Sequence, residues 1–198
     1  MKIYLVRHGE TDWNKMRKWQ GHTNIELNET GINQATVLSQ TIGEYSNISV
    51  IYASPLKRAY KTAEILNQSL CLEIIPRDGL KEVKLGAWEG MNYDDVAEQY
   101  PDDFKLWNSC SNDVDKKLGV ETLIEVRERA LSELDKLRKL TDTDFLIVGH
   151  GAWIGSLIQK LTNDVDSKKL LHVENAKLIE IEYNVERGEY RVVTDVKH

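Results

Sequence analysis

The sequence has few cysteines, no long apolar run and no leader-like segment, and each shortage excludes a class of protein. Its two cysteines, Cys71 and Cys110, are too few for a small disulfide scaffold and lack the spacing of a zinc site. No window approaches ~18 uninterrupted apolar residues, so no membrane span is expected. The apolar stretch at the N-terminus is too short for the core of a signal peptide. We therefore expect free thiols in a reducing, cytoplasmic location.

Positive charge is also in short supply. The net charge is −6, and the one basic cluster is the short group Lys15, Arg17 and Lys18. Nucleic-acid binders usually carry a basic face, so no nucleic-acid partner is expected. With 198 residues, of which 41% are hydrophobic, the chain can bury a substantial core. We expect a single domain over residues 1–198.

Short apolar segments separated by helical patterns predict an α/β fold. Residues 3–6 and 145–149 are apolar without alternation, which is typical of strands buried on both faces. Further strands are expected at 50–53, 73–75, 178–183 and 190–196, and the last two are expected to form a hairpin.

Amphipathic helices are expected between these strands. Asn28 can cap one helix, and Ser54 followed by Pro55 predicts the start of a second. The apolar face of the first comprises Ile32, Ala35, Leu38 and Ile42. A long helix follows Val120, and another covers 151–161. Together these elements predict a three-layer α/β/α sandwich with a mostly parallel central sheet.

Residues 84–119 break the alternation. They show no strand pattern, contain Trp88 and Trp107, and have a helix start at Asn92. We expect a small helical insertion that stands over the edge of the sheet. Insertions of this kind commonly line binding sites.

Basic and titratable residues follow several of the expected strands. They are Arg7, His8, Arg58, Glu82 and His150. Open α/β sheets bind ligands beyond the carboxyl ends of their strands, so we expect these side chains to surround one crevice. Arginine offers planar, paired donors that match phosphate oxygens. The expected guest is therefore a phosphate.

The backbone beside the two histidines sets a condition on this prediction. Neighbouring strand residues point to opposite faces, so Arg7 and His8 both reach the crevice only if the strand ends by Arg7. Gly9 favours such a turn, and Gly151 lets a ligand approach the backbone behind His150. The other histidines, His22, His172 and His198, are interpreted as structural.

Five ordered segments resemble the histidine phosphatase superfamily, the phosphoglycerate-mutase-like fold. They are LVRHGET (5–11), WQGHTNIELNETGINQA (19–35), SPLKRAYKTAE (54–64), LKEVKLGAWEG (80–90) and IVGHGAWI (147–154). The chain departs from the family pattern at 119–122, where many relatives carry a Gly-Glu-Ser turn. It also departs at Gly149, where a serine usually precedes the second histidine.

The resemblance implies a phosphohistidine mechanism. His8 would attack phosphorus, and Glu82 would protonate the leaving alcohol and later accept a proton from water. Arg7, Arg58 and His150 would hold the free phosphate oxygens. The implied substrate-binding residues are Arg7, Asn14, Gln20, Gly21, Arg58, His150 and Gly151. No metal or cofactor is implied, because the arginines neutralise the phosphate.

A mutase, a non-catalytic phospho-ligand binder and a zinc site are the three alternatives to a phosphatase. The family's mutases hold a substrate carboxylate with a lysine in the insertion and two arginines after an insertion tryptophan. This chain instead has Tyr93, and Asn108 and Ser109 after Trp107, so the phosphatase branch is favoured. A non-catalytic phospho-ligand binder would lack one or more of the five central residues, and this sequence has all of them. A zinc site on two histidines lacks a third ligand and lies beside arginines that repel a cation.

The substrate stays open at this point. A sugar phosphate, a phosphoglycerate, a nucleotide-loop phosphate such as α-ribazole phosphate, and a phosphoprotein all fit the motifs. Oligomeric state has no signal in the sequence.

Overall fold

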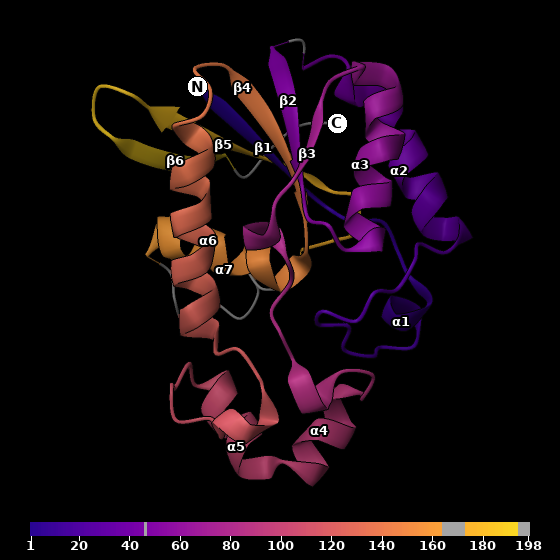
Figure 1. Ribbon diagram of the computed structural model, residues 1–198, viewed down its shortest axis with the longest axis vertical. Helices are drawn as coiled ribbons and strands as arrows, with labels where there is room; N and C mark the ends of the chain where they lie inside the picture. Colours follow the sequence, from indigo (N-terminus) through magenta and orange to yellow (C-terminus); the bar gives the residue numbers. More distant parts are fainter. Residues whose placement is uncertain (46, 164–172, 194–198) are drawn as a thin grey trace.

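The computed structural model describes residues 1–45, 47–163 and 173–193, and it is built around a mixed β-sheet (Figure 1). The strands are β1 (Lys2–Arg7), β2 (Ile48–Ala53), β3 (Ile74–Pro76), β4 (Asp144–Gly149), β5 (Leu178–Asn184) and β6 (Glu189–Val193). Their order across the sheet is β3-β2-β4-β1-β5-β6. The first four are parallel, β5 pairs antiparallel with β1, and β6 pairs antiparallel with β5.

Helices cover both faces of this sheet. The α-helices of the described residues are α1 (Asp12–Lys15), α2 (Glu29–Ile42), α3 (Lys57–Leu70), α4 (Tyr93–Gln99), α5 (Pro101–Asn108), α6 (Leu123–Arg138) and α7 (Gly151–Thr162). Helices α2 and α3 pack against each other, as do α6 and α7, and the two pairs lie on opposite sides of the sheet (Figure 1).

Alternating side chains of the central strands build two separate cores. In β1, Tyr4 and Val6 join the core under α2 and α3, whereas Ile3 and Leu5 join the core under α6 and α7. The same alternation occurs in β4. A strand buried on both faces must be apolar throughout, which is why these segments showed no alternation in the sequence. The expected three-layer sandwich is confirmed.

Two details of the helix predictions are wrong. Helix α3 begins at Lys57 with Leu56 as its N-cap, so the expected start at Ser54 and Pro55 is two residues early. The Ser54 hydroxyl accepts a hydrogen bond from the Leu56 N–H and also contacts His150, which takes it away from a helix cap. In α2, which Asn28 does cap, Ile32 is 41% exposed because the buried face runs through Gly31, Ala35, Leu38 and Ile42, and Ile32 lies beside it.

The insertion at 84–119 is helical, as expected. It consists of α4, α5 and two short 3₁₀ turns, and it lies beyond the end of the sheet beside α1 (Figure 1). Trp88 is fully buried there, against Trp19, Phe104 and Trp107. Main-chain hydrogen bonds from the Trp19 N–H to the Met91 carbonyl and from the Gly90 N–H to the Trp19 carbonyl join the insertion to the loop after α1.

Strands β5 and β6 form the expected hairpin. The part of the second predicted strand beyond Val193 lies outside the described residues, as do His172 and His198. Within the described ranges, no helix combines the length and apolarity needed to cross a membrane. Cys71 and Cys110 are both free thiols.

Two glycines let α2 touch the loop that follows β1. A Cβ atom on Gly31 would lie 2.1 Å from the Glu10 carbonyl oxygen, and one on Gly9 would lie 2.3 Å from the Gly31 carbonyl oxygen. Both distances are far below van der Waals contact with a rigid backbone. The loop that carries His8 is therefore seated directly on the first turn of α2.

Replacing Gly31 with alanine should separate these two segments. We expect Gly31→Ala to lower the free energy of unfolding by about 1–3 kcal/mol, because the new methyl group overpacks a backbone contact. Denaturant unfolding measures this. Gly43→Ala is the matched control, since nothing lies within 4 Å of its Cβ position and its φ is −66°. Equal stability of the two variants would contradict the prediction.

Candidate active site

A cavity of about 190 Å³ opens at the carboxyl ends of the parallel strands. It is lined by Arg7, His8, Asn14, Lys18, Trp19, Gln20, Gly21, Arg58, Glu82, Val83, Leu85, Trp107 and Ala152. These residues come from the loops after β1 and β3, from the first turn of α3, from the insertion and from the start of α7. Residues spread over most of the chain therefore meet in one place.

The end of β1 brings Arg7 and His8 to the same cavity. Arg7 is the last strand residue and pairs with Gly149, and the His8 N–H then donates to the Gly149 carbonyl at 3.0 Å. The Gly9 N–H donates to Thr62 Oγ1, and Asn175 Nδ2 donates to the His8 carbonyl. The strand ends where the sequence condition required, and the backbone of His8 is held on both sides.

The hydrogen bonds of His8 determine its protonation. Arg58 Nε, which can only donate, lies 3.3 Å from His8 Nε2, so this nitrogen carries a lone pair. His8 Nδ1 lies 2.7 Å from the Gly9 carbonyl and carries the proton. Burial, and then the charges of Arg58 and Arg7, hold the pKa of His8 well below its ordinary value. His8 is thus a neutral imidazole whose unprotonated nitrogen, Nε2, is the ring atom that can act as a nucleophile, and in this structure its lone pair accepts from Arg58 Nε.

Arg58 is fully buried beside this ring. Its two terminal nitrogens donate to the carbonyls of Thr23 and Gly21, both at 2.8 Å. Burial lowers the pKa of Arg58 to about 10, which still leaves the guanidinium charged at neutral pH. A buried cation of this kind needs a compensating partner. The carbonyl dipoles supply part of that compensation, and an anion in the cavity would complete it.

His150 lies behind the cavity lining and not in it. Its ring makes an edge contact with His8, with centroids 5.2 Å apart, and its side chain is fully buried. Nε2 lies 2.7 Å from Ser54 Oγ, and burial followed by the charge of Arg58 lowers the pKa of His150 well below its ordinary value. Gly151, next in the chain, leaves space for the Arg7 guanidinium, 3.2 Å from where a Cβ would stand.

Two buried donors of this cluster have no acceptor among the described residues. They are Arg7 Nε and His150 Nδ1. The other end of the Arg7 guanidinium donates to the Val173 carbonyl. Buried polar atoms in proteins are almost always hydrogen-bonded, so unsatisfied donors here leave capacity for the oxygens of a ligand.

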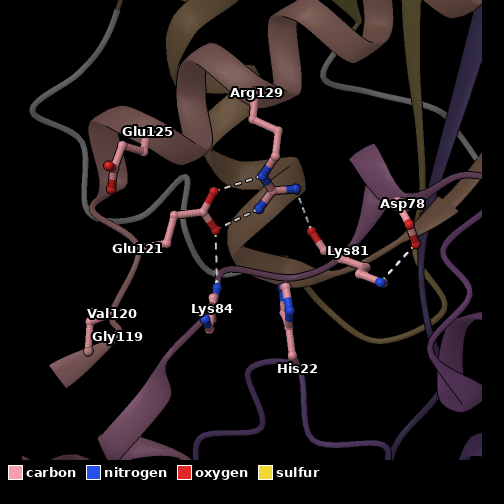
Figure 2. A pocket seen from close by; sticks show the side chains of 9 residues that line it. All are labelled: His22, Asp78, Lys81, Lys84, Gly119, Val120, Glu121, Glu125 and Arg129. Atoms are coloured by element: carbon pink, nitrogen blue, oxygen red, sulfur yellow. Dashed lines mark hydrogen bonds and ion pairs between the residues drawn. The ribbon is translucent and has the colours of Figure 1, made fainter. Parts of the chain in front are cut away.

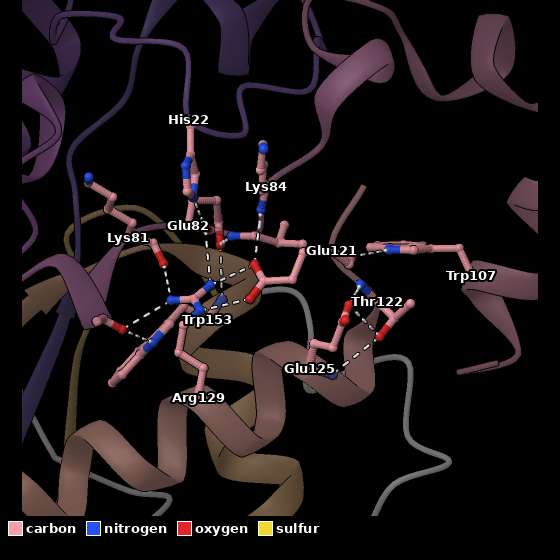
Figure 3. A network of polar contacts seen from close by, with 12 residues as sticks. His22, Lys81, Glu82, Lys84, Trp107, Glu121, Thr122, Glu125, Arg129 and Trp153 are labelled. Carbon is pink, nitrogen blue, oxygen red and sulfur yellow. Dashed lines mark hydrogen bonds and ion pairs between the residues drawn. The ribbon is translucent and has the colours of Figure 1, made fainter. Parts of the chain in front are cut away.

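Glu82 is held at the start of α7. One carboxylate oxygen accepts from the Trp153 N–H at 3.0 Å, and the other accepts from the Ala152 N–H at 3.2 Å (Figure 3). No side chain caps α7 at His150, so Glu82 satisfies two of the N–H groups that a helix leaves unpaired at its N-terminus. This contact places the carboxyl group in the cavity wall.

The remaining expected residues lie around the mouth. Asn14, Gln20 and Gly21 all line the cavity. The amide oxygen of Asn14 accepts from the Thr11 N–H and hydroxyl, so the NH₂ group is the part that can serve a ligand. Gln20 is buried, and its amide oxygen has no partner in the described part of the chain.

Sequence reasoning missed several residues of the site. Ser54 contacts His150 and does not cap a helix. Thr62, within the segment 54–64, and Asn175, outside all five segments, hold the His8 loop, and no sequence signal indicated this role. Lys18, which the sequence shows only as a member of a short basic cluster, lines the cavity. His22 is a structural histidine as expected, and its Nε2 lies 2.8 Å from the Glu82 carbonyl. No sequence pattern distinguishes Lys18 from its basic neighbours, so its place in the site is known only from the cavity lining.

Comparison with known proteins decides the family. The model of the histidine phosphatase superfamily (branch 1) matches residues 3–196. The chain belongs to this superfamily. The expected family is therefore confirmed, and a phosphatase is favoured over the mutase alternative.

Several relatives of this superfamily cover almost the whole chain. An uncharacterized phosphatase PhoE of Bacillus subtilis is 38% identical over 93% of this chain and 90% of its own length. Phosphoserine phosphatase 1 of Hydrogenobacter thermophilus is 32% identical over 93% of this chain and 92% of its own. A mutant phosphoserine phosphatase of Entamoeba histolytica, solved with phosphoserine, aligns with a TM-score of 0.83 at 27% identity over 98% of this chain and 95% of that one. Phosphoserine phosphatase from Entamoeba histolytica, solved with 3-phosphoglyceric acid, gives 0.82 at 28% identity over the same shares.

The neutral histidines make stability depend on pH. Because burial holds the pKa of His8 below 6.5, the unfolded chain binds a proton that the folded chain does not as the pH falls below 6.5. The contribution is complete above pH 6.5 and is lost below it, by about 1.4 kcal/mol per pH unit for each such imidazole.

His8→Gln should therefore flatten this dependence. We expect its free energy of unfolding to fall less than that of the natural protein between pH 6.5 and 5.5, by about 1 kcal/mol over that interval. Denaturant unfolding at three pH values measures both slopes, with His22→Gln as the control. Parallel slopes would mean that folded His8 is protonated.

Proposed function

We propose that this superfamily member hydrolyses small phosphomonoesters through a phosphohistidine at His8. The observation that carries the proposal is the lone pair on His8 Nε2, which points at a buried guanidinium in a cavity with unsatisfied donors. A nucleophile that stays neutral and has an anion site beside it suits attack on phosphorus. The two free thiols further support a cytoplasmic location.

The proposed reaction has two displacements. In the first, a bond forms between His8 Nε2 and phosphorus while the bond from phosphorus to the leaving oxygen breaks. In the second, water attacks phosphorus and the bond to Nε2 breaks, which releases inorganic phosphate. Arg7, Arg58 and His150 stabilise the charge on the three free oxygens in both steps, and electrostatic stabilisation is most of what phosphoryl transfer requires.

Glu82 handles the protons in this proposal. It gives a proton to the leaving oxygen in the first step and accepts one from the attacking water in the second. Its carboxyl group already lies in the cavity wall, held by the N–H groups of Ala152 and Trp153. Among the described residues, no group of three or more His, Cys, Asp or Glu side chains could hold a metal.

Lys18 supports a substrate that also carries a carboxylate. It lines the cavity between Trp19 and the insertion, half-buried, and its ammonium makes no ion pair among the described residues. Its Nζ lies over the ring of Trp13, 5.9 Å from the ring centroid. A second anionic group on the substrate would pair with this cation. Phosphoserine and phosphoglycerate, which the structural neighbours bind, both have one.

His8→Ala should abolish turnover. We expect phosphate release from p-nitrophenyl phosphate to continue in excess chelator and to fall to background in the variant, because the covalent step has no other nucleophile. An alkaline quench followed by intact mass measurement should detect one phosphoryl group on the natural protein. Loss of activity with chelator and its return with zinc would instead support a metal site.

Lys18→Gln should affect substrates selectively. We expect KM for phosphoserine and 3-phosphoglycerate to rise about 10-fold, since a charge-assisted contact is lost, with kcat little changed. Glycerol phosphate, which lacks the carboxylate, should be unaffected, and exposed Lys15→Gln is the matched control. A parallel assay for 2-phosphoglycerate separates hydrolysis from mutase activity. An equal rise for all substrates would contradict carboxylate recognition.

A further inference from the structure

A second network lies behind Glu82, outside the substrate cavity. It centres on Arg129 of α6 and Glu121, which precedes that helix, and it borders a surface hollow of about 390 Å³ (Figure 2). Neither residue lines the substrate cavity. The network reaches Glu82 through its backbone and not through its carboxyl group (Figure 3).

Arg129 uses every N–H that a guanidinium has. One terminal nitrogen donates to the carbonyls of Gly79 and Lys81, at 3.0 and 2.8 Å. The other donates to the Glu82 carbonyl at 3.2 Å and to Glu121 Oε2 at 2.7 Å, and Nε donates to Glu121 Oε1 at 2.7 Å. Three of the five donors in this rigid plane thus fix carbonyls of one short loop, and the other two pair with the Glu121 carboxylate.

Glu121 extends the network to the wall of the substrate cavity. Its carboxylate accepts from the Lys84 N–H at 3.1 Å, and its own N–H donates to the Lys84 carbonyl at 2.8 Å. Its carbonyl accepts from the indole N–H of Trp107 at 3.0 Å, and Trp107 lines the cavity (Figure 3). The loop that carries Glu82 is therefore tied on both sides of that residue, at 79–82 and at 84.

The position of the Glu82 carboxylate depends on the position of this loop. Its carboxylate meets two N–H groups of α7, while its backbone is held by Arg129 of α6 and by His22. Trp153 of α7 also donates its indole N–H to the Gly79 carbonyl at 2.9 Å. A small displacement of the loop would move the carboxyl group away from the leaving oxygen, and proton transfer is sensitive to such distances.

We infer that Arg129, clamped by Glu121, is a positioning residue that aims the Glu82 carboxyl group at the leaving oxygen. This inference rests on the proposed role of Glu82 as proton donor. Arg129 does not line the cavity in which substrate is proposed to bind. It therefore acts on the protonation of the leaving group and leaves phosphate binding unaltered.

The dependence on leaving group distinguishes positioning from mere stabilisation. An alkyl phosphate such as phosphoserine needs a proton on its leaving oxygen, whereas p-nitrophenyl phosphate releases a stable phenolate and needs it far less. We expect Arg129→Lys to lower kcat/KM for phosphoserine about 10-fold or more, because general acid catalysis is worth roughly 10²–10⁴. The value of kcat/KM for p-nitrophenyl phosphate should change less than about 3-fold, because kcat/KM reports on the step that releases the leaving group and not on the later attack by water, in which Glu82 acts as a base.

A double-variant comparison completes the experiment. In a Glu82→Gln background, Arg129→Lys should cause no further loss with phosphoserine, since there is no acid left to position. Arg138→Lys, on the same helix but directed at Tyr183 and Tyr190, is the matched control and should leave both rates unchanged. Glu121→Gln, which keeps the shape of the clamp but removes its charge, should reproduce the selective loss in weaker form.

Three results would overturn the inference. Equal losses on both phosphates in a variant that remains folded by circular dichroism would mean a structural role only. Full activity of Arg129→Lys and Glu121→Gln would mean that the loop stands without the clamp. If Glu82→Gln itself fails to discriminate between the two phosphates, the assignment of Glu82 as proton donor fails first, which separates that failure from a failure of Arg129.

Discussion

The burial of positive charge beside neutral imidazoles is the constraint on which this molecule depends. Arg58 is fully inside the protein, next to His8 and His150, and desolvation of all three disfavours their charged forms. The guanidinium remains charged whereas the imidazoles give up their protons. The result is a buried positive charge with an imidazole lone pair beside it, an arrangement that is unfavourable alone and that the proposed phosphate would relieve.

The fold supports this arrangement with main-chain contacts from several directions. Parallel strands end together, so β1 and β4 deliver His8 and His150 to the same edge of the sheet. The contact between Gly9 and Gly31 seats the His8 loop on α2, and Thr62 holds it from α3. The position of the His8 ring therefore depends on the helical layer formed by α2 and α3 and not on the loop alone.

The proposed proton donor and the wall of the cavity belong to one connected structure. The chain of contacts runs from Trp107 in the cavity wall through Glu121 and Arg129 to the backbone of Glu82. The insertion, which carries Trp107, is thus linked to Glu82 as well as to the cavity.

The sequence by itself determined the fold class and the family, because apolar periodicity and ordered motifs are local signals, and it predicted the residues proposed to act in the site. It predicted that Arg7 and His8 share the crevice only if the strand ended there, and β1 does end at Arg7. The tertiary structure alone decided that Ser54 faces His150 instead of capping α3, that Lys18 enters the cavity, and that Arg129 holds the Glu82 loop. Each of these contacts joins residues distant in the chain or depends on packing, and no local pattern records such a meeting.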